Sequence, residues 1–280
     1  PPQTGPAVAA AVLRAIDRVD AELARRLHDG PRPKPYAITP VLDEQNRPPR
    51  PDSAQVRFEV GVLADELFAP VFHALMTEPA WRIGRTCYRN AGTEVSALTS
   101  YADIAAAARP VSSWGFRLHT PTAFATAKEE GARRQRTLPE PEWIFRALVP
   151  RWRMFTAGSP AADLPDTLPV AVEEHLEVVD FTLRLAEHLV KPGVPPVRGA
   201  VGVIRYALAE AGRVPADARR ALDALATFAR FAGLGDRTTV GMGYATPLPA
   251  GPPPRPRRSS PARSATASPT PPVPSEAAAR

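Results

Sequence analysis

The sequence predicts an α+β protein made of two tandem ferredoxin-like (RRM-like) domains, followed by a disordered Pro/Arg-rich tail. Segments with helical and strand periodicity alternate in the order helix, strand, strand, helix, strand, and a second run repeats this plan. The composition then changes sharply to proline, arginine and serine. We therefore expect domains at 1–108 and 109–246, the second of which contains a glycine-rich loop, and a tail at 247–280.

The first expected element is a helix over residues 7–28. Its apolar residues recur at spacings of three and four, which places them on one face; they are Val12, Ile16, Val19, Leu23 and Leu27. The segment HDGPRPKP then ends the helix, because glycine and proline do not continue it.

Strand-like and helical segments follow this turn. The expected strands cover residues 36–42, 56–63, 81–88 and 94–98, and a helix is expected over 64–77. A βαββαβ unit also has a strand before its first helix, so we expect this missing first strand to precede residue 1. The second unit is expected to comprise strand 114–119, helix 142–155, a strand pair at 174–189 and 197–208, helix 215–232, and a last strand beginning within 240–244.

Composition excludes several classes of protein. No uninterrupted apolar run approaches the roughly 20 residues that span a bilayer, and no secretory signal is visible, so we expect no membrane association. The single Cys87 excludes an internal disulfide framework and favours a cytoplasmic location. The net charge of +6 is weak evidence for nucleic acid, because residues 247–280 carry +4 of it. Such a tail adds salt-dependent RNA affinity or has no role.

The glycine-rich loop GLGDRTTVGMG covers residues 233–243. It lacks the GK[ST] ending of a P-loop, and it leads from a helix toward a strand, opposite to a dinucleotide-binding motif. Glycine allows close backbone approach, so the loop is a candidate phosphate site. The alternative is a helix C-cap with a tight turn. The candidate RNA-binding residues of the loop are Gly233, Gly235, Arg237, Thr238, Thr239, Gly241 and Gly243.

Several segments of the chain, taken in order, resemble the CRISPR-associated repeat-RNA endoribonucleases of the RAMP superfamily. The matching segments are LHDGPRPKPYAITPVL (27–42), LHTPTAF (118–124), LPEPEWIFRALVPRW (138–152), RGAVGVIRYAL (198–208) and FAGLGDRTTVGMGYA (231–245). This resemblance implies metal-independent cleavage of CRISPR precursor RNA within its repeats. The 2′-hydroxyl attacks the adjacent phosphate, which leaves a 2′,3′-cyclic phosphate and a 5′-hydroxyl. The alternative is a non-catalytic RNA-binding RAMP subunit of a CRISPR effector complex.

The resemblance also implies the catalytic residues. A family histidine ends the first helix and a lysine follows six residues later, which correspond to His28 and Lys34. We expect His28 to act as general acid or base and Lys34 to neutralise developing phosphate charge. Some family members carry a tyrosine one helix length earlier, where this chain has Leu13 and Arg14. The second catalytic residue therefore stays open, and Tyr36 is expected to pack within its strand.

The remaining histidines and tryptophans are expected to be structural. His119 is expected at a strand edge, His73 in a helix as a surface or packing residue, and Trp114, Trp143 and Trp152 in the core. No metal site or other cofactor is expected, since His175 and His188 have no cysteine partners.

Arg133, Arg134 and Arg136 form a basic run that is a candidate for contacts to an RNA stem. The expected partners are the CRISPR repeat RNA, its processed product (crRNA) and, in the alternative, effector-complex subunits. The sequence leaves open whether two chains associate as a homodimer.

Overall fold

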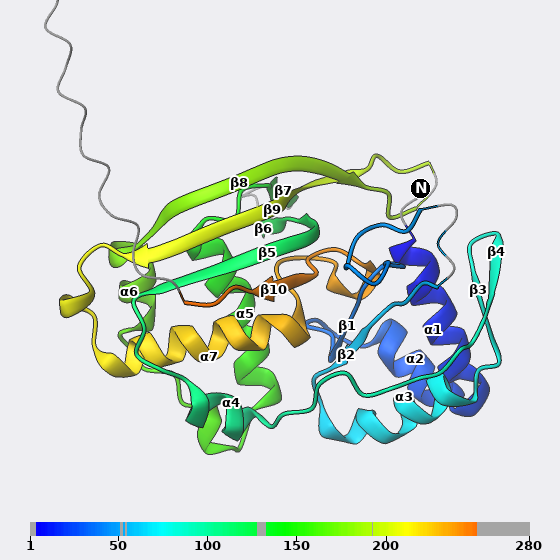
Figure 1. The fold of residues 1–280 in the computed structure, drawn as a ribbon. Helices are drawn as coiled ribbons and strands as arrows, with labels where there is room; N and C mark the ends of the chain where they lie inside the picture. Colours follow the sequence, from blue (N-terminus) through cyan, green and yellow to red (C-terminus); the bar gives the residue numbers. More distant parts are fainter. Residues whose placement is uncertain (1–3, 51–52, 54, 128–132, 192, 251–280) are drawn as a thin grey trace, which may run out of the picture.

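A computed structural model of the chain describes residues 4–50, 53, 55–127, 133–191 and 193–250. The chain forms two halves that lie side by side, with the N-terminal elements at one end and a long antiparallel sheet at the other (Figure 1). Most of the tail expected at 247–280 lies outside the described residues, which end at Ala250. No helix of the described part is long and apolar enough to span a membrane.

The second half has the order strand, helix, strand, strand, helix, strand. These elements are β5 (Ser113–Thr122), α5 (Pro141–Phe155), β8 (Leu176–His188), β9 (Val197–Leu208), α7 (Ala216–Ala232) and β10 (Ala245–Pro247). The four strands form one antiparallel sheet in the order β10-β5-β9-β8. Numbered along this half, the order is 4-1-3-2 with helices after strands 1 and 3, which confirms the predicted ferredoxin-like plan.

The helices α5 and α7 lie beside one face of this sheet (Figure 1) and enclose its core. Apolar residues of α7 recur at spacings of three and four, and Leu222, Leu225 and Phe228 are fully buried. Trp152 of α5 packs edge-on against Phe228 with ring centroids 5.4 Å apart. The buried Tyr206 hydroxyl of β9 donates to the carbonyl oxygen of Pro139.

The first half begins with two helices, α1 (Gly5–Val19) and α2 (Ala21–Asp29), instead of the single helix expected over 7–28. Asp20 separates them because its backbone is extended (φ −150°, ψ 94°). Its carboxylate accepts a hydrogen bond from the amide of Leu23 at 2.9 Å, which caps α2. This break turns Val19 away from the expected apolar stripe, and 45% of it is exposed.

The strands of the first half are shorter than expected. They are β1 (Tyr36–Ile38), β2 (Val60–Val62), β3 (Ala80–Ile83) and β4 (Thr86–Arg89), with α3 (Asp65–Thr77) between β2 and β3. The segment 81–88 is a hairpin because Gly84, with φ +63°, reverses the chain. The segment 94–98 is not a strand.

A groove of about 950 Å³ lies between β2 and β3. In the ferredoxin-like order 4-1-3-2 that the second half shows, strand 1 lies between strands 3 and 4. If the first half is counted with a strand before α1, then β2 is strand 3 and β3 is strand 4, so the groove lies at the position of strand 1. The expectation of a strand before residue 1 is not tested by the described residues and stays a prediction. The boundary predicted at residue 108 also stays a prediction, and α4 (Tyr101–Ala107) just before it packs on the core of the second half.

Other short elements were not predicted. They are the hairpin of β6 (Phe124–Ala127) and β7 (Arg133–Arg136), α6 (Leu168–His175), and the 3₁₀ turns η1 (Pro160–Ala162), η2 (Ala211–Arg213) and η3 (Thr238–Val240). The last strand begins at Ala245 rather than within 240–244. Gly241 and Gly243 both have positive φ, which interrupts the extended backbone before that point.

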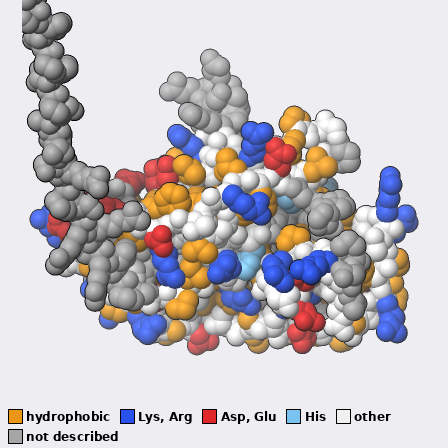
Figure 2. All heavy atoms as spheres, turned by 45° about the horizontal axis from the view of Figure 1, so that its top comes forward, with side chains coloured by type: hydrophobic (Ala, Val, Ile, Leu, Met, Phe, Trp, Pro, Cys, Tyr) orange, Lys and Arg blue, Asp and Glu red, His pale blue; other side chains and the backbone are white. Residues whose placement is uncertain are grey.

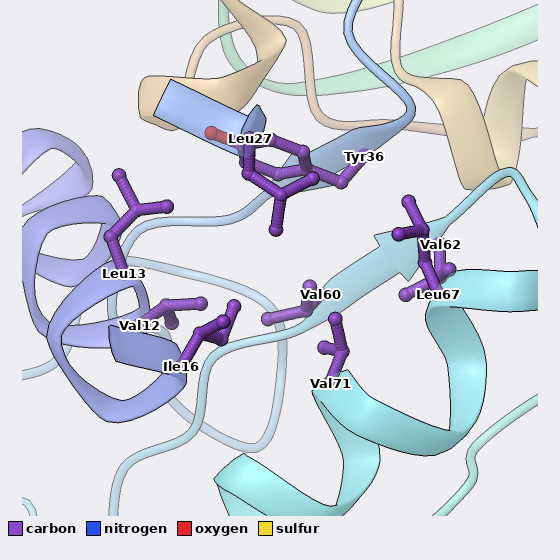
Figure 3. A pocket seen from close by; sticks show the side chains of 9 residues that line it. All are labelled: Val12, Leu13, Ile16, Leu27, Tyr36, Val60, Val62, Leu67 and Val71. Carbon is purple, nitrogen blue, oxygen red and sulfur yellow. The ribbon is translucent and has the colours of Figure 1, made fainter. Parts of the chain in front are cut away.

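The first half has its own core, with a small cavity between α1, α2, α3, β1 and β2 (Figure 3). It is lined by Val12, Leu13, Ile16, Leu27, Tyr36, Val60, Val62, Leu67 and Val71. Among these residues, Tyr36 alone carries a side-chain polar group. The cavity is therefore a packing gap without the groups that chemistry requires.

Candidate functional site

The last turn of α2 presents His28 to solvent. Its side chain is 73% exposed, and Nδ1 lies 2.7 Å from Oδ1 of Asp29. An adjacent carboxylate accepts a hydrogen bond from the Nδ1–H group and thereby leaves Nε2 free to exchange a proton with a substrate. The chain turns at Gly30, the C-cap of the helix, as the sequence predicted.

Lys34 folds back onto this turn. Its Nζ donates to the carbonyl oxygen of His28 at 2.8 Å and to that of Gly30 at 2.5 Å. Burial and the nearby Arg32 guanidinium lower the Lys34 pKa, and Asp29 partly opposes them. Lys34 therefore satisfies carbonyls at the end of α2 and holds the segment that carries His28.

The glycine-rich loop closes on itself after α7. Gly233 caps the helix with φ +69°, and the amide of Leu234 donates to the carbonyl oxygen of Gly243 at 2.8 Å. The amides of Asp236 and Gly243 donate to carbonyl oxygens of Ala123 and Pro121 just after and within β5. The prediction that Gly233 is a helix C-cap is thus confirmed. The rest of the loop is held at the end of β5 by these hydrogen bonds.

The loop glycines are buried where backbone segments approach closely. A Cβ at Gly235 would overlap the carbonyl oxygen of Ala123, and one at Gly241 would lie 2.7 Å from Cα of Gly5. Gly5 is the first residue of α1, so the loop is packed between the end of β5 and the first half. These glycines let the chain approach other protein backbone, and they shape the loop from within.

Two arginines and one aspartate join the loop to the His28 turn. The partly buried Arg151 donates to the carbonyl oxygens of Ala232, Gly233 and Gly235 at 2.9, 3.3 and 2.9 Å. Burial lowers its pKa to about 10, opposed by the carboxylate of Asp236. Oδ1 of Asp236 also lies 3.8 Å from Nη1 of Arg32, in the turn after His28. The second half therefore touches the candidate catalytic turn through Asp236.

The candidate RNA-binding side chains divide by exposure. In the loop, Arg237 and Thr239 are partly exposed, whereas Thr238 is buried. Arg237 has a left-handed backbone (φ +59°, ψ +31°), which is uncommon for a non-glycine residue. Arg136 is exposed on β7, with its guanidinium 5.4 Å from the ring centre of Trp143. The side chains of Arg133 and Arg134 lie outside the described residues. Lys and Arg side chains gather in a row across the face shown in Figure 2.

The other histidines differ in environment. His119 of β5 is half-buried, with Nε2 2.9 Å from the Thr246 hydroxyl and its ring stacked on Tyr244. His188 is buried at the end of β8, whereas His73 is exposed on α3, which is the first of the two roles expected for it, surface or packing. Among the described residues, no cluster of three or more potential ligands is placed to hold a metal ion.

The aromatic residues mostly occupy the predicted core positions. Trp114 and Trp152 are buried, and Trp143 packs at the edge of the same core. Tyr36 is also buried, and burial raises its pKa, so it packs rather than reacts. These residues therefore support the fold beneath the site.

Two ferredoxin-like units with a glycine-rich loop after the last helix define a protein of the RAMP type. The sequence profile of the family described as CRISPR-associated endoribonuclease Cas6 matches residues 116–245. Across a longer span, the chain is 30% identical to Cas6 of Thermus thermophilus in a product complex, with a TM-score of 0.73, covering 89% of this chain and 95% of that one. The chain belongs to the Cas6 family and is an endoribonuclease.

Other solved structures agree with this assignment. A second structure of the Thermus thermophilus protein is 28% identical, with a TM-score of 0.63 and coverage of 89% and 93%. A Cas6-related protein from Pyrococcus furiosus is 15% identical, with a TM-score of 0.54 and coverage of 89% and 92%, and it shows the fold alone. No match was found among curated protein sequences.

Sequence reasoning missed Asp29, Arg32, Arg151 and Asp236. Asp29 had a local signal, because a carboxylate beside a candidate histidine can orient its ring. Asp236 lies inside the loop motif, yet its contact with Arg32 joins residues about two hundred positions apart. Arg151 lies in α5, whose apolar periodicity indicates only a helix packed on the core. Periodicity within one segment gives no information about such contacts between segments.

Proposed function

We propose that this chain cleaves CRISPR precursor RNA within its repeats, without a metal ion, by attack of a 2′-hydroxyl on the adjacent phosphate. The products are a 2′,3′-cyclic phosphate and a 5′-hydroxyl. The observation that carries the proposal is the exposed His28–Asp29 pair, in a turn that Arg32 joins to the glycine-rich loop. The similar Thermus thermophilus Cas6 in a product complex supports repeat RNA as the substrate.

His28 supplies proton transfer in this proposal. With the Nδ1 proton directed to Asp29, neutral His28 accepts the 2′-hydroxyl proton at Nε2; protonated His28 donates to the departing 5′-oxygen. A single histidine can serve one of these steps in a given turnover, and water supplies the other. The exposure of the ring leaves room for an RNA backbone beside it.

Lys34 both supplies a positive charge and holds the turn that carries His28. Two of its three ammonium protons are directed to the carbonyl oxygens of His28 and Gly30. The third is available for a non-bridging oxygen of the phosphorane, where negative charge develops. Loss of Lys34 therefore removes a cation and releases the turn that holds His28.

In this proposal, the glycine-rich loop and the arginines of β7 hold the RNA. Arg237 and Thr239 are the partly exposed loop donors, and the loop that presents them is shaped by the buried residues Gly233, Gly235, Thr238, Gly241 and Gly243. Arg136, together with Arg133 and Arg134, is proposed to contact stem phosphates. The reaction is assigned to the cytoplasm, in keeping with the free thiol of Cys87.

The test is cleavage of the cognate repeat RNA in EDTA by the wild type, His28→Ala and Lys34→Met. His73→Ala is the matched control, because His73 is also an exposed histidine on a helix. We expect wild-type and His73→Ala to cut alike, and His28→Ala to lose at least about a hundredfold in rate. A 2′-deoxy nucleotide at the scissile position should block cleavage.

The outcomes separate the parts of the proposal. Cleavage that requires added metal, or that proceeds on the 2′-deoxy substrate, contradicts the mechanism. Full activity of His28→Ala contradicts the role of His28 alone. Tight RNA binding by the wild type without any cleavage favours the alternative, a non-catalytic RNA-binding subunit of an effector complex.

A further inference from the structure

Arg32 lies in the turn that carries the candidate catalytic residues. It follows His28 by four positions and precedes Lys34 by two. Its side chain is 62% exposed, and it pairs with the carboxylate of Asp236, whose Oδ1 lies 3.8 Å from Nη1. This distance is too long for a hydrogen bond. The contact therefore orients the guanidinium by charge and leaves its N–H groups available to another acceptor.

The backbone of Asp236 is fixed to the second half of the chain. Its amide donates to the carbonyl oxygen of Ala123 at 2.8 Å, and a Cβ on the preceding Gly235 would overlap that same oxygen. The carbonyl oxygen of Gly235 also accepts a hydrogen bond from Arg151 at 2.9 Å. Asp236 is therefore a fixed negative charge that faces the His28 turn from the glycine-rich loop.

One carboxylate serves two guanidinium groups at this joint. The charges of Asp236 and Arg32 both act on Arg151, so the three side chains lie close together. Arg151 is partly buried and donates to three loop carbonyls, whereas Arg32 is the guanidinium that a substrate can reach. Asp236 balances one of the two positive charges. The exposed Arg32 thus has the charge and the free donors that bind a phosphate.

The scissile phosphate needs more positive charge than Lys34 supplies. Negative charge develops on its non-bridging oxygens as the phosphorane forms. Two of the three ammonium protons of Lys34 are directed to backbone carbonyls, and Asp29 adds a negative charge beside His28. A second cation in the same turn compensates for both. A guanidinium can also bind two phosphate oxygens at once, with the geometry of a planar fork.

We propose that Arg32 is a catalytic residue whose guanidinium binds the non-bridging oxygens of the scissile phosphate, and that Asp236 is the positioning residue that holds it. RNA bound by Arg237, the neighbour of Asp236 in the loop, then passes the turn that contains Arg32 and His28. Arg32 stays protonated throughout, so it stabilises the phosphorane and takes no part in proton transfer. This inference rests on the proposed function, because it assigns a residue to that cleavage reaction.

The test measures the single-turnover cleavage rate at saturating repeat RNA, together with the dissociation constant of that RNA. We expect Arg32→Ala to lower the rate at least about tenfold, and Arg32→Lys to recover only part of the loss, because lysine lacks the planar fork. Guanidinium ion added to the solution should raise the rate of Arg32→Ala but not that of the wild type, which a purely structural role does not predict. Arg26→Ala is the matched control, because Arg26 is also an exposed arginine close to His28, and it should cut at the wild-type rate.

Asp236→Asn tests the positioning role separately. Removal of a carboxylate beside the RNA should leave the affinity unchanged or tighter, since phosphates are repelled less. The rate at saturating RNA should nevertheless fall about fivefold, because the guanidinium is no longer held in place. In the Arg32→Ala background the same change should cause no further loss, because Asp236 acts through Arg32.

The outcomes distinguish this inference from the proposed function. If the wild type cuts and Arg32→Ala cuts as fast as Arg26→Ala, or loses affinity alone, the catalytic role of Arg32 is overturned while cleavage by His28 stands. Equal losses from Asp236→Asn with and without Arg32 overturn the positioning role. A wild type that does not cut at all contradicts the proposed function itself. Circular dichroism and thermal melting show that each variant is folded, and Arg32→Lys, which keeps the charge, is the second variant should Arg32→Ala not fold.

Discussion

Replacement of Gly235 by alanine tests whether the glycine-rich loop depends on close backbone approach. Gly235 has φ +74°, and an added Cβ would overlap the carbonyl oxygen of Ala123. That oxygen accepts a hydrogen bond from the amide of Asp236 at 2.8 Å, so it cannot move without loss of this bond. The added methyl group therefore has to displace the loop from the end of β5.

The expected cost has two parts. A left-handed backbone costs an L-residue about 1–2 kcal/mol. Forcing an extra methyl group into a packed position costs about 1–3 kcal/mol more. The free energy of unfolding of Gly235→Ala should thus fall by about 2–5 kcal/mol, and RNA affinity should fall with it, because Arg237 moves with the loop.

Two other glycines separate these parts. Gly84 also has positive φ (+63°), but a Cβ there would meet nothing within 4 Å, so Gly84→Ala should show only the backbone cost. Gly212 has neither feature, and its alanine variant should lie within about 0.5 kcal/mol of the wild type. Urea unfolding followed by circular dichroism gives all three values, and filter binding of repeat RNA gives the affinities.

Equal destabilisation by Gly235→Ala and Gly84→Ala would refute the reasoning, since close approach would then contribute nothing. Unchanged RNA affinity in a destabilised Gly235→Ala would separate the stability of the loop from its proposed contact with RNA. The series therefore tests the structural and the functional claims independently.

Three further predictions concern the site and its surroundings. Arg151→Met should lower the free energy of unfolding in urea by about 2–4 kcal/mol, because three carbonyls lose a charged donor, and Arg151→Lys should recover part of it. Asp29→Asn should lower the single-turnover cleavage rate about tenfold with little change in RNA affinity; an unchanged rate would exclude orientation of His28 by Asp29. Burial lowers the pKa values of His119 and His188 below 6.5, so the unfolded chain takes up protons first as the pH falls. The contribution of these two histidines to the free energy of unfolding should be complete above about pH 6.5 and decline below it. In urea unfolding at pH 5–7, His119→Gln should make the free energy of unfolding depend less steeply on pH.

The sequence predicted the second half well because its elements are long. The helix α7 and the pair β8–β9 each contain enough residues for one periodicity to dominate. The first half was harder to predict because single residues decide its elements. Asp20 splits a continuous apolar stripe by capping α2, and Gly84 turns one apparent strand into a hairpin.

The candidate site was predictable only in part. His28 and Lys34 came from resemblance, and the structure adds Asp29 as the partner of the imidazole. The glycine-rich loop was evident as a motif, yet its glycines face protein backbone that no local pattern identifies. The link from Asp236 to Arg32 depends on how the two halves pack, which residue spacing does not encode.

The contact of Gly5 with Gly241 limits how this protein can evolve. A side chain at either position would meet the backbone of the other segment, so the distance between the halves is set by two missing side chains. A glycine at the start of α1 adds little to the stability of the helix. Gly5 instead allows α1 to approach the backbone at Gly241 closely. Any larger residue at either position would push the two halves apart. Changes in RNA preference therefore have to come from exposed side chains, while the contact between Gly5 and Gly241 is kept.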